Sequence, residues 1–331
     1  MRVLSVVVTV ALTAACGRDG VVTPVSPDPP APPPVSEVGC ARTSVGLTPL
    51  IEPGSYQGHP LGLYPGGQNQ PPGDHLAAGL DLARGVEPLD ASGQPSPAGR
   101  FALISIGMSN TTQEFSAFVP LAAADSSRHP RLAIVDGAQG GMTAADWQNP
   151  GCSCWSVLEV RLQNAGVSRQ QVVAAWIKVA DRQPSTGWPA HAQTLANETI
   201  VVLQRLKARF PNLRLAYLSS RIYAGYATTT LNPEPYAYES GFAMRWAIDE
   251  QLAGNPALRY TGDDAPAPWI AWGPYLWADG LRARSDGLTW ACSDFQSDGT
   301  HPSPSGRQKV AERLLDFVRT DPTASEWYLQ R

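Results

Sequence analysis

The sequence predicts an α/β fold in which helices cover both faces of a parallel sheet. Short apolar runs bounded by Gly, Pro or Ser recur along the chain, and amphipathic segments separate them. Apolar residues make up 43% of the 331 residues, which is enough for a large core. Continuous apolar runs are typical of strands buried on both faces, and strands that alternate with helices favour a parallel sheet.

Four apolar runs predict the strands of this sheet: residues 100–107, 130–141, 171–180 and 213–220. Residues 192–211 carry apolar side chains at helical spacing and end at a proline, which stops a helix. A further helix is expected over residues 240–252. Binding sites in such folds form outside the carboxyl ends of the strands, so functional residues are expected there.

Ser109 follows the first predicted strand by two residues, and Thr111 to Glu114 form a T-x-x-E pattern that predicts a capping box. A serine at a strand-to-helix turn presents its hydroxyl at the sheet edge and its N–H near a positive helix terminus, as a nucleophile requires. The alternative is a serine that merely starts a helix. After the second strand, two adjacent glycines let the backbone approach a ligand, without the G-x-G-x-x-G spacing of a dinucleotide site.

Asp298 and His301 stand three residues apart in the loop before the last amphipathic segment. A serine hydroxyl needs a base, and a histidine base needs a carboxylate to fix its tautomer. The alternative is a turn carboxylate beside a surface histidine. The chain order Ser, Asp, His is one in which triads occur, and together with the glycine turn it favours catalysis.

These motifs resemble those of the SGNH/GDSL hydrolases, serine esterases and acylhydrolases with a flavodoxin-like three-layer α/β sandwich. The stretch "GMSN" is similar to the family's first block, with Met108 in place of Asp, and the resemblance covers roughly residues 100–320. It implies that Ser109 is the nucleophile, His301 the base and Asp298 its partner. It also implies that the N–H groups of Ser109 and Gly141 bind the oxyanion.

The family's third block, G-x-N-D, lacks its asparagine here. Its Gly would fall near Lys178 and its Asn near Ala180 or Asp181, so a side-chain donor to the oxyanion is missing. Asn110 or Lys178 is the expected substitute, and a lysine that reaches solvent is the alternative. Loss of one such donor costs roughly 10²–10³ in turnover in other enzymes. The alternatives are therefore a weakened enzyme and an inactive protein that still binds.

Three further features concern the substrate. Arg221, at the end of the fourth predicted strand, is expected to bind a carboxylate or sugar hydroxyls, with a structural ion pair as the alternative. Aromatic residues in 232–241 and 268–277 are interpreted as loop surface for sugar rings, with core packing as the alternative. Residues 45–99 are interpreted as an irregular segment that lines the cleft. The five histidines are scattered and no ligand spacing predicts a metal or other cofactor.

The N-terminus predicts export and a lipid anchor. Residues 1–15 have the form of a signal peptide, and Cys16 directly after small residues resembles a bacterial lipoprotein signal. The alternative is a plain cleaved signal with an incidental cysteine. Residues 16–38 are Pro-rich and predict an extended tether, and residues 39–331 form the hydrolase domain.

Four cysteines remain in the domain and predict disulfides with three connectivities: Cys40, Cys152, Cys154 and Cys292. A bond between Cys152 and Cys154, separated by one residue, is expected to be geometrically awkward, so each is predicted to pair elsewhere. A bond at Cys292 would brace the C-terminal loop.

The net charge of −4 is not that of a nucleic-acid-binding protein, and no nucleic-acid partner is expected. We expect a serine esterase attached by its lipid to the bacterial cell envelope, at the outer membrane, the cell surface or in the periplasm. Its expected substrates are small acyl esters, above all acetyl esters on carbohydrate. The alternatives are a glycan-binding pseudo-hydrolase and a lipase or thioesterase for longer acyl chains.

Overall fold

The computed structural model describes residues 37–330. The described residues belong to one compact unit, Ser36–Arg331. The predicted signal peptide, Cys16 and the tether up to residue 36 lie outside the described residues and stay predictions. No described helix is both long enough and apolar enough to span a bilayer.

The core of the domain is a five-stranded parallel sheet in the order β4-β3-β5-β6-β7. By position in the chain this is the flavodoxin-like order 2-1-3-4-5, in which the strand order reverses between the first and third strands. Every residue of β3 and β5 is buried, as expected for strands covered on both faces. The predicted fold class is therefore confirmed. The strands are β3 (Phe101–Gly107), β4 (Leu132–Val135), β5 (Val172–Lys178), β6 (Leu215–Leu218) and β7 (Trp269–Trp272).

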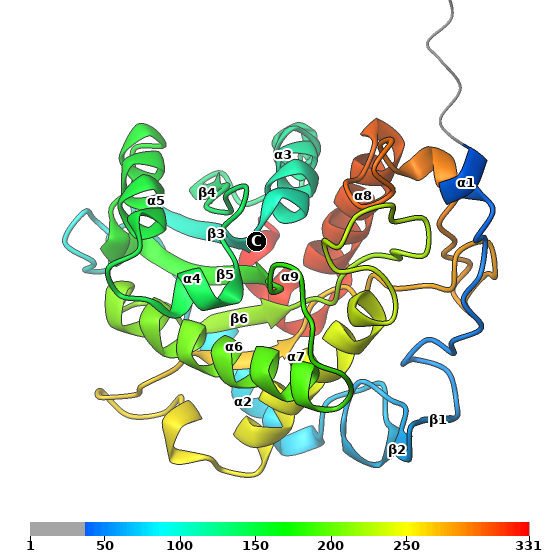
Figure 1. Cartoon of the computed structure of the whole chain (residues 1–331). Helices are drawn as coiled ribbons and strands as arrows, with labels where there is room; N and C mark the ends of the chain where they lie inside the picture. The colour runs from blue at the N-terminus through cyan, green and yellow to red at the C-terminus, as the bar shows by residue number, and fades with distance from the viewer. Residues whose placement is uncertain (1–36, 331) are drawn as a thin grey trace, which may run out of the picture. The chain divides into compact units, whose positions relative to one another are not determined.

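Helices cover the two faces of the sheet. On one face α3 packs on α8, α8 on α9 and α9 on α2, while on the other α6 packs on α7 and α4 (Figure 1). The larger helices are α2 (Gly73–Arg84), α3 (Ser109–Ala124), α5 (Ser153–Asn164), α6 (Ala190–Arg209), α7 (Tyr236–Leu252) and α8 (Pro304–Thr320). The shorter elements include α1 (Glu37–Cys40), α4 (Ala144–Gln148), α9 (Pro322–Tyr328) and a hairpin of β1 (Ser55–Tyr56) and β2 (His59–Pro60).

Two segments that were expected to be loops belong to the core. Residues 45–99 contain α2, whose buried residues His75, Gly79 and Ala83 recur every four positions and face the sheet. A Cβ on Gly79 would lie 2.4 Å from the Trp269 ring, so glycine lets this helix approach closely. Residues 268–277 contain β7, and their tryptophans are buried. The interpretation of this stretch as an exposed surface for sugars is wrong.

The predicted capping box at the start of α3 is also wrong. The helix begins at Ser109, and its N-cap, Met108, makes no side-chain cap hydrogen bond. Thr111 Oγ1 instead donates to the carbonyl of Lys178 (2.7 Å), and Glu114 is fully buried. These polar side chains face the end of the sheet because the helix starts three residues earlier than the pattern predicts, with Met108 rather than Thr111 as the N-cap.

Two disulfides are present in the domain. Cys40 pairs with Cys292 and so joins the start of the domain to the segment before the loop that carries Asp298 and His301. Cys152 pairs with Cys154, which corrects the expectation that each pairs elsewhere. Their Cα atoms lie 5.2 Å apart, inside the usual range for a disulfide, because Cys152 is the N-cap of α5 and the chain turns there. Disulfides indicate an oxidising, exported environment.

Candidate active site

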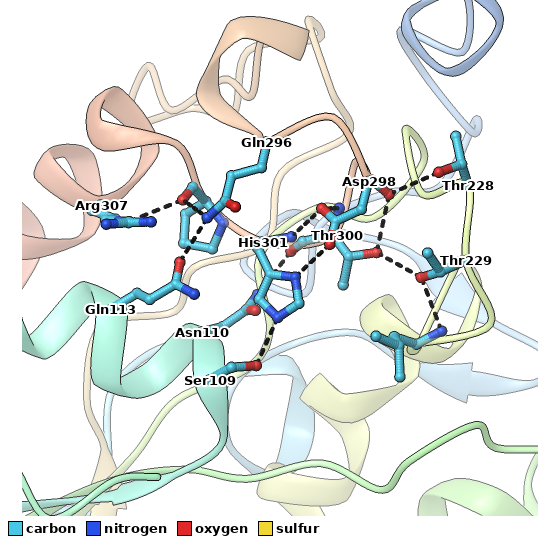
Figure 2. Close-up of polar contacts among 12 residues, drawn as sticks. Ser109, Asn110, Gln113, Thr228, Thr229, Gln296, Asp298, Thr300, His301 and Arg307 are labelled. Carbon is cyan, nitrogen blue, oxygen red and sulfur yellow. Dashed lines mark hydrogen bonds and ion pairs between the residues drawn. The ribbon is translucent and has the colours of Figure 1, made fainter. Parts of the chain in front are cut away.

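The three residues predicted to form a triad lie together at the carboxyl edge of the sheet (Figure 2). Ser109 Oγ lies 2.8 Å from His301 Nε2, and His301 Nδ1 lies 2.5 Å from Asp298 Oδ2. An ionised Asp298 accepts a hydrogen bond from the Nδ1–H group of His301. Nε2 then carries no proton and can accept a hydrogen bond from the serine hydroxyl. This is the arrangement that a histidine base and a serine nucleophile require.

Hydrogen bonds keep Asp298 ionised and in place. Its Oδ1 accepts from the backbone N–H groups of Thr300 and His301, each at 3.0 Å. Burial raises the pKa of the carboxyl, but the bonds from the His301 ring and from these two N–H groups outweigh burial and lower the pKa below its usual value. A charged acceptor therefore faces the imidazole.

The loop that carries Asp298 and His301 is fixed at several points. Gln296 N–H donates to the His301 carbonyl (2.8 Å), and Gly299 adopts a positive φ of 63° where a Cβ would collide with the Tyr226 carbonyl. Ser303, two residues after the histidine, caps α8. The disulfide at Cys292 lies just before this loop. The loop is thus held between α8 and the disulfide-bonded segment.

Asn110, a predicted alternative oxyanion donor, serves this loop instead. Its side chain is buried and Nδ2 donates to the Thr300 carbonyl at 2.9 Å, next to the Ser109–His301 contact (Figure 2). The amide therefore connects α3, the helix that begins at Ser109, to the loop that carries His301. This assignment corrects the expectation that Asn110 faces the oxyanion.

The glycine turn after β4 passes beside the nucleophile. A Cβ on Gly140 would lie 4.0 Å from that of Ser109, and Gly141 follows with a positive φ of 79°. Within residues 37–330 no hydrogen bond engages the N–H of either glycine. Arg182, for which no sequence motif predicts a role, donates to the Gly141 carbonyl at 2.7 Å. The turn thus offers free backbone donors next to Ser109.

Asp136 anchors this turn, and its role was not predicted. Its carboxylate accepts from the hydroxyls of Ser105 in β3 (2.6 Å), Thr112 in α3 and Ser116 in α3 (3.2 Å). Burial raises the pKa of Asp136, while these hydroxyls oppose the shift. An aspartate at a strand end directly before glycines is the sequence signal that would have drawn attention to it. Asp136 connects the glycine turn to the nucleophile helix.

Lys178, the other alternative oxyanion donor, lies in a buried ion pair. Nζ contacts both carboxylate oxygens of Glu114 at 2.5 Å, and the two side chains are 1% and 0% exposed. Burial raises the pKa of Glu114 and lowers that of Lys178 to about 8. Lys178 therefore neither donates to an oxyanion nor reaches solvent, because its ammonium is directed beneath α3.

The third block of the resemblance also contributes no other side-chain donor. The carbonyl of Ala180 accepts from Ala144 N–H at 3.0 Å, and the carbonyl of Asp181 accepts from the Asn232 amide. Among the described residues, the donors at the glycine turn are its own backbone N–H groups and the Arg182 guanidinium that bonds Gly141. Among the described residues, no group of three or more His, Cys, Asp or Glu side chains could hold a metal ion.

Arg221 lies three residues beyond β6, at the same edge of the sheet. It is 5% exposed, and its Nε has no hydrogen-bond partner among the described residues. The predicted structural ion pair is absent from this part of the chain, since no carboxylate there lies within 4.0 Å of the guanidinium. The predicted binding role is taken up below.

Comparisons with known proteins identify no family for this chain. No family model matches it, and no curated protein does. A diltiazem-metabolizing enzyme from a gut microbe has a TM-score of 0.37 at 14% identity, over 71% of this chain and 48% of that one. This chain thus spans about half of that enzyme's length.

Two other solved structures are similar at the same low level. The periplasmic domain of a lipopolysaccharide acetyltransferase from Salmonella ser. Paratyphi A gives a TM-score of 0.38 at 11% identity, over 73% of this chain and 95% of that one. A Bacteroides fragilis protein predicted to be an acylhydrolase gives a TM-score of 0.40 at 9% identity, over 78% of this chain and 100% of that one. Similarity this low establishes neither family nor activity, so the functional argument depends on the site.

Proposed function

We propose that this protein is a serine esterase that hydrolyses small acyl esters, with Ser109, His301 and Asp298 as its catalytic residues. The observation that carries the proposal is the continuous hydrogen-bonded series from Ser109 Oγ through His301 to Asp298. Each link has the donor and acceptor that general-base catalysis requires.

In the proposed reaction, Ser109 Oγ attacks the ester carbonyl carbon while its proton moves to His301 Nε2. Asp298 stabilises the imidazolium that forms. The carbonyl oxygen becomes an oxyanion beside the N–H of Ser109 and the glycine turn, where Gly141 and its neighbour Gly140 are the candidate donors. The imidazolium then gives its proton to the leaving alcohol. A water molecule, deprotonated by His301, releases the acid and restores the serine.

The missing side-chain donor predicts a slow enzyme rather than a binding protein. Loss of one donor costs roughly 10²–10³ in turnover, whereas triad enzymes exceed the uncatalysed reaction by far larger factors. A pseudo-hydrolase would have no need of a tautomer fixed by a charged Asp298. Carbohydrate as the alcohol and the envelope as the location remain proposals, motivated by the predicted lipid anchor.

The decisive experiment measures turnover of 4-nitrophenyl acetate by the purified protein and its Ser109→Ala and His301→Ala variants. Both variants should lose more than 99% of the activity. Ser156→Ala and His129→Ala are matched controls, since these residues lie on α5 and before β4, and they should retain it.

A fluorophosphonate provides a second readout, because it labels an activated serine covalently. Peptide mass spectrometry should place the adduct on Ser109 in the wild type and find none in His301→Ala. Equal rates in wild type and variants, with no adduct at Ser109, would rule out the proposal. Rates on acetate and octanoate esters distinguish a short-chain esterase from a lipase.

A further inference from the structure

Arg221 is a buried cation that forms no ion pair with the described residues. It is 5% exposed, and its Nε is buried without a hydrogen-bond partner in this part of the chain. Two comparably buried arginines have partners. Arg284 donates to the carbonyls of Tyr275 and Trp277. The Arg245 Nε also lacks a hydrogen bond, but its Nη1 donates to the Pro60 carbonyl and its side chain forms an ion pair with Asp249. Buried charges in proteins are normally paired and hydrogen-bonded, so this exception indicates a missing ligand.

The acids nearest to Arg221 in electrostatic terms already have other partners. Glu114 contacts Lys178 through both oxygens. Glu234 accepts hydrogen bonds from the Trp277 indole (2.7 Å) and two backbone N–H groups. Both attract Arg221 only at longer range, and its pKa is lowered because burial outweighs that attraction. The positive charge is therefore under-compensated in the ligand-free protein.

Arg221 shares the sheet edge with the proposed catalytic residues. It follows β6, which pairs with β5, and β5 pairs with β3 directly before Ser109. Two strand spacings are roughly 10 Å, and an arginine side chain spans much of that distance. The carboxylate of Glu114, on the helix that Ser109 starts, attracts the Arg221 guanidinium at longer range. A ligand group that reaches Arg221 would therefore lie about one sugar ring from the nucleophile.

We propose that Arg221 binds a carboxylate of the substrate, so that the enzyme acts on esters of acidic alcohols such as O-acetylated uronic acids. A carboxylate matches the guanidinium in charge and can accept two parallel N–H donors. This inference deepens the proposed function, since it rests on Ser109 being the nucleophile for the ester of the same molecule.

The structure makes a prediction that separates ligand binding from a structural role. Arg221→Gln removes a buried charge that forms no ion pair with the described residues, so it should raise the melting temperature of the ligand-free protein. Arg245→Gln is the matched control, because it removes a buried arginine that bonds Pro60 and pairs with Asp249, and it should lower the melting temperature. Glucuronate should raise the melting temperature of the wild type and have no effect on Arg221→Gln. Glucose should have no effect on either.

The kinetic test uses acetylated glucuronic acid and its methyl ester as an acidic and neutral substrate pair. A hydrogen bond to a charged group contributes about 1.5–3 kcal/mol, so the acidic-to-neutral ratio of kcat/KM should fall about 10- to 100-fold in Arg221→Gln. Arg245→Gln should leave that ratio unchanged. An unchanged ratio in Arg221→Gln, or a lower melting temperature than wild type, would overturn the inference.

A third measurement keeps the two proposals separate. Calorimetry on Ser109→Ala should detect glucuronate binding, and the double variant with Arg221→Gln should lose it. Binding that depends on Arg221 in a protein without esterase activity would support the carboxylate site and refute the proposed reaction. Ester hydrolysis without glucuronate binding and without a preference for the acidic substrate would support the proposed reaction and refute the carboxylate site.

Discussion

Replacing Asp298 by asparagine tests the most specific feature of the site, the fixed tautomer of His301. The carboxylate accepts from Nδ1 at 2.5 Å and from two backbone N–H groups at 3.0 Å. Asparagine has the same shape and can still accept from the backbone. Its NH₂ group would then face Nδ1, which favours the tautomer with the proton on Nε2. That nitrogen could no longer accept the proton of Ser109.

The expected loss follows from charge as well as tautomer. An imidazolium and a carboxylate whose charge centres lie about 4 Å apart attract by about 4 kcal/mol at an effective dielectric constant of about 20. In rate this is about a thousandfold. The tautomer adds to it, and in a serine protease the same substitution lowers kcat by roughly 10⁴. We therefore expect Asp298→Asn to lower kcat about 10³- to 10⁴-fold with little change in KM.

The assay is the pH dependence of kcat on 4-nitrophenyl acetate, with circular dichroism to show that the variant is folded. Asp286→Asn is the matched control, since Asp286 is similarly exposed but pairs with Arg284 and Arg313 away from the loop. That variant should keep full kcat. A loss below tenfold in folded Asp298→Asn would refute the assigned role of the carboxylate.

Three further predictions concern stability. Lys178→Met leaves the buried Glu114 carboxylate without its partner and should lower the free energy of unfolding, measured with urea, by about 3–5 kcal/mol. Replacing both Lys178 and Glu114 by Met should recover most of this loss. An equal loss in the single and double variants would contradict this prediction. Cys40→Ala with Cys292→Ala opens a link across 252 positions and should lower the unfolding free energy by about 2–5 kcal/mol, measured against the wild type under the same oxidising conditions. Burial and the neighbouring Asp181 raise the pKa of Glu198 to about 8, so the native state keeps a proton that the unfolded chain loses above its ordinary pKa. Stability should therefore fall as pH rises through that interval, and Glu198→Gln should flatten the melting-temperature profile between pH 5 and 8; an unchanged slope would exclude Glu198 as the cause.

Much of the fold follows from local sequence. The continuous apolar runs of β3 and β5 are recognisable because strands covered on both faces need no polar alternation. The run in β7 was missed because its tryptophans also suit an exposed binding surface, and composition alone does not distinguish the two. Helix α2 was missed because Gly and Pro on either side of it obscure a short buried face.

The sequence by itself determined the strand-helix alternation, the Asp298–His301 pair and the candidate serine, because each depends on periodicity or on residues close in the chain. The tertiary structure decided which groups are in contact. It placed Ser109 next to His301, 192 positions away, and paired Lys178 with Glu114. It also decided that Cys152 bonds its near neighbour Cys154. It also left the Arg221 Nε without a hydrogen-bond partner among residues 37–330. The physical reason is that the energy of a buried charge depends on the atoms around it, and that arrangement exists only once the sheet and its helices have packed.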